Sequence, residues 1–247
     1  MQEKHLFEYA VIRVVPRVER EEFINAGVII VAGAVGLLLR KGIPEEMNCS
    51  LQNALGLLIL VIGIYYGIKA DSFAVVALSL AIGGVIGEWR QWEHKLEKLG
   101  ARLEKMLGGE KNQFTKGFVS ASLVFCIGAM GVIGALENGL TGDYHILLIK
   151  SILDGILAII FSASMGVGVL FSSIPVLFYQ GAISLAAGLL KPFVNDVMLN
   201  NITAMGGILI AGLGLNILGV AKIRVANFLP GIFLVPFVMW LLHFIAL

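Results

Sequence analysis

The sequence predicts an all-α polytopic membrane protein with about eight transmembrane helices. Of its 247 residues, 58% are hydrophobic and 14% are charged, whereas soluble domains are about 45–50% apolar and about 25% charged. The charges are unevenly distributed as well. Between positions 118 and 190 the charged residues are only Glu137, Asp143, Lys150 and Asp154. Because about 20 apolar residues cross a bilayer as a helix, this stretch alone predicts three crossings.

The first 23 residues differ in character from the rest of the chain. Residues 9–16, YAVIRVVP, form a short β-branched segment, and the charged run 17–22, RVEREE, follows it. This order favours a strand and a polar turn over a membrane span. We therefore expect residues 1–23 to be an atypical N-terminal head, strand-like or disordered, and residues 24–247 to form the transmembrane helical domain.

From residue 24 onward, apolar stretches alternate with polar or Pro/Gly breaks. The predicted spans are 24–40, 51–69, 72–88, 117–137, 146–166, 170–190, 201–219 and 226–246. The apolar run 146–190 is too long for one crossing, because a helix rises about 1.5 Å per residue and the hydrocarbon layer is about 30 Å thick. The glycines at 166 and 168 therefore predict a turn between the fifth and sixth spans.

One amphipathic helix is predicted outside the spans, at about residues 88–107. Its apolar residues recur at alternating spacings of four and three and so form one stripe. That stripe consists of Trp92, Leu96, Leu99, Leu103 and Met106. Such a helix either lies at the membrane surface against its own bundle or binds a partner through the stripe.

The distribution of Lys and Arg predicts the orientation of the chain. The loop 88–117 carries seven of them, and the positions 40, 41, 222 and 224 bring that side to eleven. The opposite side has three in its loops and spans, Lys69, Lys150 and Lys191, although the head adds four more. Short internal loops weigh most in the positive-inside rule. We therefore expect loop 88–117 in the cytoplasm and both termini outside.

Two parts of the chain resemble each other weakly. Residues 28–36, VIIVAGAVG, align with residues 176–184, VLFYQGAIS, at an offset of 148 that later becomes 150. The aligned pairs include Gly33 with Gly181, Ala34 with Ala182 and Gly56 with Gly206. Spans one to three would then correspond to spans six to eight in inverted orientation, an arrangement typical of transporters. The alternative is a chance match between Gly/Ala-rich helices.

Polar residues within the spans are the candidate functional groups, because an ionisable group there costs roughly 2.5–3.5 kcal/mol. Asp154 lies about two turns into span five, with Lys150 four residues earlier on the same face. The full candidate set is Asp154, Lys150, Asn25, Gln180, Glu137 and Asn216. Two interpretations stay open: an ion or proton site, or a self-neutralising pair with amides that bond between helices.

Several classes of function are disfavoured by the sequence. The two cysteines, Cys49 and Cys126, lie in a loop and in a span and predict neither a disulfide framework nor a metal site. There is no GxSxG, Walker A or HExxH motif. We therefore expect no enzyme activity, no catalytic, cofactor-binding or metal-binding residue and no cofactor. A net charge of +1 without a basic arm gives no indication of nucleic-acid binding.

Several phrases resemble a known family. They are INAGVIIVAGAVGLLLRKGIPEE, GGVIGEW, FVSASLVFCIGAMGVIGALENGLTGD, KSILDG, VLFYQGAISLAAGLL and LGLNILGVAKIRVANFLP. Together they cover about residues 24–247 and resemble the bacterial YqgA-like membrane proteins, domain of unknown function 554. The resemblance implies a multi-pass inner-membrane protein with no established activity. Residues 5–25 instead resemble the opening of the soluble domain of unknown function 3037, the combination that a hybrid gene would produce.

These observations favour an inner-membrane transporter or channel for a small solute or ion. The alternative is a non-transporting membrane scaffold or regulator that acts through the cytoplasmic amphipathic helix. The expected partners are the lipid bilayer and a small solute or ion, with a second copy of the chain as a further alternative.

Overall fold

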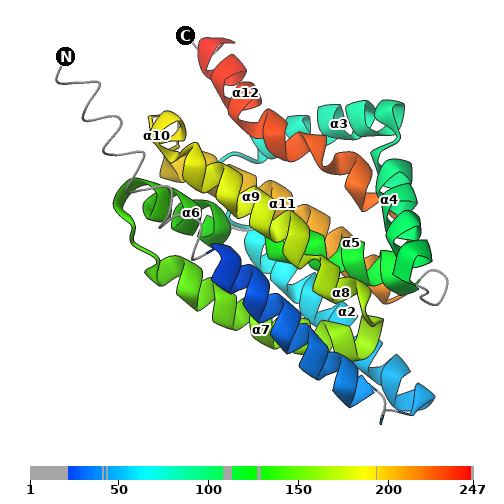
Figure 1. The fold of residues 1–247 in the computed structure, drawn as a ribbon. Coiled ribbons are helices and arrows are strands. Elements are labelled where there is room, and N and C mark those ends of the chain that lie inside the picture. Colours follow the sequence, from blue (N-terminus) through cyan, green and yellow to red (C-terminus); the bar gives the residue numbers. More distant parts are fainter. Residues whose placement is uncertain are drawn as a thin grey trace.

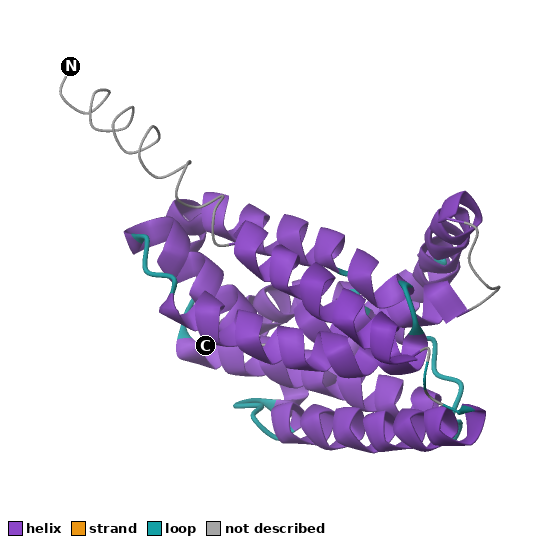
Figure 2. Ribbon diagram, turned by 60° about the horizontal axis from the view of Figure 1, so that its bottom comes forward, coloured by secondary structure: helices purple, strands orange, loops and turns teal. Residues whose placement is uncertain are grey.

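The computed structural model describes residues 22–40, 42, 44–107, 113–126, 129–192 and 194–245, and its long helices lie side by side (Figure 1). Every regular element in these ranges is a helix (Figure 2). The helices are Glu22–Arg40, α2 (Glu45–Gly67), α3 (Phe73–Arg90), α4 (Trp92–Leu107), α5 (Gln113–Cys126), α6 (Ala129–Thr141), α7 (His145–Met165), α8 (Gly168–Phe171), α9 (Ser173–Leu185), α10 (Ala187–Leu190), α11 (Asp196–Ile217), η1 (Val225–Phe228) and α12 (Pro230–Ile245).

The predicted all-helical membrane fold is confirmed. Seven helical runs of the described chain are long and apolar enough to cross a membrane, and the pair α5 and α6 makes an eighth if it counts as one span. The predicted turn between spans five and six is present, since α7 ends at Met165 and Gly166 has φ +85°. Glycine adopts this left-handed conformation without the steric cost that a side chain brings.

The predicted span 117–137 corresponds to a bent pair of helices. The structure has α5 and α6 in its place, inclined to each other by 61°. Glycines on α6 allow it to approach α7 and α9 closely after the bend. A Cβ at Gly139 would lie 2.1 Å from the carbonyl oxygen of Ser184, and one at Gly134 would lie 3.1 Å from the Leu147 side chain.

The amphipathic helix begins later than the predicted residue 88. Span α3 continues to Arg90, Gln91 takes a left-handed φ of 53°, and α4 starts at Trp92. This residue turns the chain out of the α3 direction. Helix α4 packs on α5 and η1, with Trp92 and Leu96 half-buried, while the other three side chains of the stripe lie outside the described residues.

The predicted head also ends earlier than residue 23. Glu22 and Phe23 belong to the first long helix, and the Glu22 side chain is buried. The helical domain therefore begins two residues before the predicted residue 24. Residues 1–21 of the predicted head lie outside the described part of the chain.

Two antiparallel helix pairs approach through glycines. Along α2 and α11, Gly56 faces Leu218 and Gly67 faces Gly207, so the contacts run in reverse order. A Cβ on Gly63, between them, would lie 2.3 Å from the backbone nitrogen of Ala211. The pair α3 and α12 is similarly close. Between helices in lipid, small residues allow the backbone contact that provides van der Waals attraction.

Candidate functional site

A polar network is buried where three helices meet. Asn25 comes from the first helix, Lys150 and Asp154 from α7, and Gln180 from α9. All four are at most 6% exposed. The Asn25 Nδ2 group donates to Asp154 Oδ2 at 3.3 Å and to Gln180 Oε1 at 3.0 Å. The structure thus brings four of the six candidate residues together.

Lys150 connects this network to the end of α5. Its ammonium group forms an ion pair with the Asp154 carboxylate and donates to the Phe125 carbonyl oxygen at 2.7 Å. Phe125 is the penultimate residue of α5, and the last four carbonyls of a helix lack partners within it. The end of α5 ahead of the bend therefore supplies the acceptor that orients Lys150.

The hydrogen bonds determine how the two amides are oriented. The Asp154 carboxylate only accepts, so the nitrogen of Asn25 has to face it. Asn25 then gives its other N–H to the oxygen of Gln180. This leaves Asn25 Oδ1 and Gln180 Nε2 buried without a partner among the described residues. Buried polar atoms are nearly always paired, so the hydrogen bonding of the network is incomplete at these two atoms.

A cavity of about 410 Å³ adjoins the network, between α2, α6 and α7. Among the described residues, Lys150 and Asp154 are the charged groups that line it. The rest of the lining is apolar or aromatic and includes Tyr65 and Tyr66, near the end of α2. Mostly apolar pockets with a few convergent polar groups are the usual form of a small-molecule site.

A second buried polar pair was missed by the sequence analysis. The Asn138 Nδ2 group on α6 donates to Glu22 Oε1 at 3.0 Å, and both residues are 1% exposed. Glu22 Oε2 has no partner among the described residues. Because Glu22 lies one helical turn before Asn25, this pair extends the polar face of the first helix beyond the network.

Replacing Glu22 by alanine is expected to reduce the free energy of unfolding by about 1–3 kcal/mol, because Asn138 loses its acceptor and stays buried. Glu22→Gln retains an oxygen acceptor and should cost distinctly less. Thermal melting in mild detergent measures both variants. Removal of residues 1–20 is the matched control and is expected to leave the melting temperature unchanged. Equal melting of Glu22→Ala and the parent chain would contradict the expectation.

The two remaining candidates lie elsewhere. Glu137 is half-buried near the end of α6 and takes no part in the network. Asn216 closes a turn after α11, where its Nδ2 donates to the Ile223 carbonyl oxygen at 2.6 Å and its Oδ1 accepts from the Ile223 N–H at 2.7 Å. Its position in the structure is explained by this local role.

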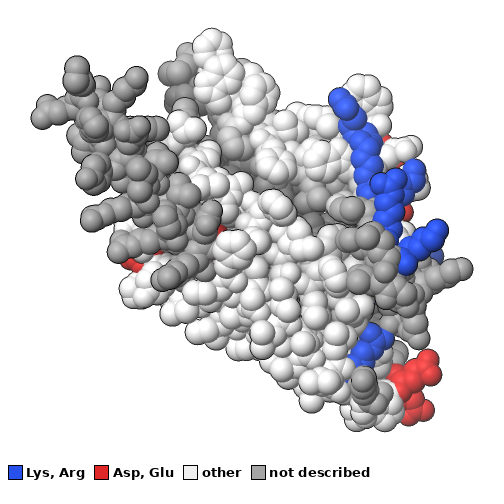
Figure 3. All heavy atoms as spheres, viewed as in Figure 1, with Lys and Arg blue, Asp and Glu red and all other residues white. Residues whose placement is uncertain are grey.

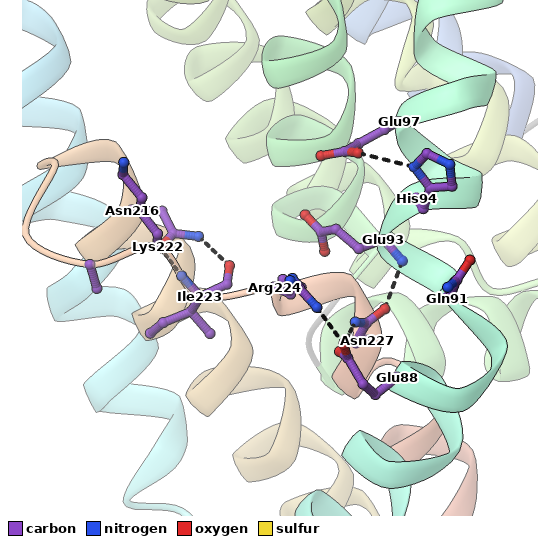
Figure 4. A pocket seen from close by; sticks show the side chains of 11 residues that line it. Glu88, Gln91, Glu93, His94, Glu97, Asn216, Lys222, Ile223, Arg224 and Asn227 are labelled. Carbon is purple, nitrogen blue, oxygen red and sulfur yellow. Dashed lines mark hydrogen bonds and ion pairs between the residues drawn. The ribbon is translucent and has the colours of Figure 1, made fainter.

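A larger, polar cavity of about 750 Å³ lies where α4 meets the α11–α12 connection (Figure 4). Glu93 Oε2 accepts from the Ala226 N–H at 2.8 Å, and the Glu93 N–H donates to Asn227 Oδ1 at 2.7 Å. Burial raises the pKa of the Glu93 carboxyl group, and the Ala226 hydrogen bond opposes that rise. Glu88 adds an ion pair with Arg224. The Glu93 contacts hold α4 against η1, and the Glu88 ion pair joins the end of α3 to the residue that precedes η1.

Comparisons with known proteins identify relatives but no activity. The family model described as "Protein of unknown function (DUF554)" matches residues 21–240. The "Uncharacterized protein YqgA" of Escherichia coli (strain K12) is 33% identical over 217 residues, 86% of this chain and 92% of its own length. The "Uncharacterized membrane protein YdfK" of Bacillus subtilis (strain 168) is 33% identical over 223 residues, 89% of this chain and 95% of its own length. No solved structure matches. The chain is therefore a helical membrane protein that belongs to the DUF554 family.

Proposed function

We propose that this protein is a bacterial inner-membrane transporter or channel for a small solute or ion, and not an enzyme. The observation that carries the proposal is the buried network of Asn25, Lys150, Asp154 and Gln180 beside a cavity. Ionisable groups within membrane helices are rare and mark substrate or ion pathways. Lys150 and Asp154 join this network to the cavity and present a donor and an acceptor to the passing species.

The packing of the helices supports an inverted repeat around this network. The first helix contacts the α8–α9 segment in reverse order, with Asn25 bonded to Gln180 and Gly33 next to Leu170. Helix α2 pairs in the same antiparallel way with α11, and α3 with α12. Each helix of the first proposed repeat thus contacts its counterpart in the antiparallel sense, which is the relative direction that a twofold axis in the membrane plane produces. Transport sites lie at such repeat interfaces near the midplane.

We propose that the α4 end of the molecule faces the cytoplasm. Lys and Arg side chains gather along this edge of the molecule (Figure 3). The Arg40 guanidinium lies beside Gly166, and Gly168 contacts Phe114 at the start of α5. These contacts put the end of the first helix, the α7–α8 turn and the start of α5 at the same end. The positive-inside rule then favours the cytoplasm for it.

A single cysteine at position 100, in a variant without the native cysteines, is expected to resist a membrane-impermeant maleimide in intact cells. It should react in inverted vesicles, where the cytoplasmic face is outside. A cysteine at position 143, in the α6–α7 loop, is the matched control and should show the opposite pattern. Labelling of position 100 from outside intact cells would overturn the orientation.

Transport is tested with purified protein in proteoliposomes. The probes are radiolabelled rubidium, acetate, glycine and leucine, and uptake of at least one of them should exceed that of empty vesicles. Asn25→Leu removes the amide that joins the helices and should reduce this uptake at least tenfold. Asn53→Leu introduces the same change at an exposed position on α2 and should leave uptake unchanged. Uptake equal to empty vesicles, or unaffected by Asn25→Leu in folded protein, would reject transport.

The scaffold or regulator alternative has less support. It needs an unpartnered apolar face on α4, but Trp92 and Leu96 are half-buried and α4 packs on α5 and η1. The described part of α4 therefore uses these apolar residues within its own bundle, which is the surface-helix interpretation of its stripe.

A further inference from the structure

We infer that the cavity between α2, α6 and α7 binds a net-neutral zwitterion with an apolar body, the chemistry of a hydrophobic amino acid. That this ligand is transported rests on the proposed function. That it binds rests on the cavity alone. The inference is supported by the unused hydrogen-bonding groups of the ion pair, by its zero net charge, and by the apolar walls and the size of the cavity.

The ion pair has one hydrogen-bond donor and one hydrogen-bond acceptor that no described residue uses. An ammonium group has three N–H donors, and Lys150 uses two of them, for Phe125 and Asp154. The hydrogen bonds of Asp154 to described residues both end on Oδ2. One N–H of Lys150 and the Oδ1 atom of Asp154 therefore remain available. A carboxylate on the ligand matches the first, and an ammonium group matches the second.

The charge of the site favours a ligand with no net charge. Lys150 and Asp154 neutralise each other and are 6% and 5% exposed. A ligand with a single charge would be buried beside a site of zero net charge. Burial of such an unpaired charge is unfavourable at low dielectric. A zwitterion adds two opposite charges, and each of them meets the complementary member of the pair. The ligand then extends the salt bridge into an alternating set of four charges.

The walls and the volume match the remainder of such a molecule. Leu58, Ile62, Leu153 and Leu157 present aliphatic surface, and Tyr66 adds an aromatic ring. A cavity of about 410 Å³ is large enough for leucine or phenylalanine and lies within the usual size range of small-molecule sites. A small polar solute would leave the apolar wall without contacts.

The aromatic residues of the cavity lining lie near the end of α2. Tyr65 and Tyr66 line the cavity and lie within one turn of the end of α2 at Gly67. The Lys69 ammonium lies over the Tyr65 ring, 4.4 Å from its centroid. Aromatic and basic residues together are typical of the membrane–water interface.

The test is equilibrium binding of radiolabelled L-phenylalanine to the purified full-length protein. Saturable binding is expected, with 3-phenylpropionate and phenethylamine at least tenfold weaker because each carries only one of the two charges. Glycine, which lacks the apolar body, should also be at least tenfold weaker. Single-charge analogues that compete as well as phenylalanine, or the lack of saturable binding, would overturn the inference.

Matched tryptophan variants place the ligand. Ile156 lines the cavity, whereas Ile152, one turn earlier on α7 and also exposed, does not. Ile156→Trp should weaken phenylalanine binding at least fivefold, and Ile152→Trp should change it less than twofold. Equal effects of the two would exclude this cavity as the site.

The two proposals fail in different ways. Binding without uptake of any probe would retain the zwitterion site and reject transport. Uptake of rubidium or acetate that depends on Asn25, without phenylalanine binding, would retain transport and reject the zwitterion.

Discussion

Replacing Lys150 by methionine is expected to lower the free energy of unfolding by about 3–5 kcal/mol, among the largest effects of any single substitution in this chain. The change leaves Asp154 buried, with Asn25 as its one remaining donor among the described residues. An unpaired carboxylate in that position loses its solvation without gaining an ion pair. Chemical unfolding in mild detergent, followed by circular dichroism, measures the change.

Two further variants identify the cause. The double variant Lys150→Met with Asp154→Leu removes both charges and should recover most of the lost stability, because a buried pair contributes little against an apolar replacement. Lys116→Met makes the same substitution at an exposed lysine and should change stability by less than about 0.5 kcal/mol. A double variant as unstable as Lys150→Met would show that lost packing, and not the unpaired charge, is responsible.

Replacing Gly63 by alanine is expected to destabilise the fold by about 1–3 kcal/mol, although alanine is the better helix former. The new methyl carbon would lie 2.3 Å from the Ala211 nitrogen and 2.7 Å from the Gly207 carbonyl oxygen. Both are backbone atoms of α11, so relief requires movement of the whole helix and not rotation of one side chain. Thermal melting in detergent is the measurement.

Gly27→Ala is the control for this substitution. A Cβ at Gly27, in the first helix, meets no atom within 4 Å, so the variant should melt at or above the temperature of the parent chain. Melting of Gly63→Ala at or above that temperature would mean that α2 and α11 are not held in the close contact of the structure.

The positions of the interior polar residues were easier to predict from the sequence than their hydrogen-bond partners. Asn25, Asp154 and Gln180 stand out because each interrupts an apolar helix, where an unpaired polar group is unfavourable. Their mutual hydrogen bonds join residues as far apart as 25 and 180. No local pattern contains that information, because it depends on how the helices are arranged in three dimensions.

The features that were missed have identifiable causes. Glu22 ends the charged run 17–22, so composition assigned it to a solvated head, whereas the first helix carries it into contact with Asn138. Asn138 was missed because the predicted span ended at Glu137, which left Asn138 outside the spans. The bend between α5 and α6 lies in a uniformly apolar, glycine-rich segment, and hydropathy does not distinguish a bent span from a straight one.

The glycine contacts between α2 and α11 limit how the bundle can change shape. Two backbone surfaces at this distance resist separation, since their contacts are lost together, and α2 and α11 therefore behave as one unit. On its other side α2 shares far fewer contacts with α7, and the cavity opens between these two helices. Widening of the cavity is therefore expected from shear of α7 past a stiff α2–α11 unit, and not from a hinge within that unit.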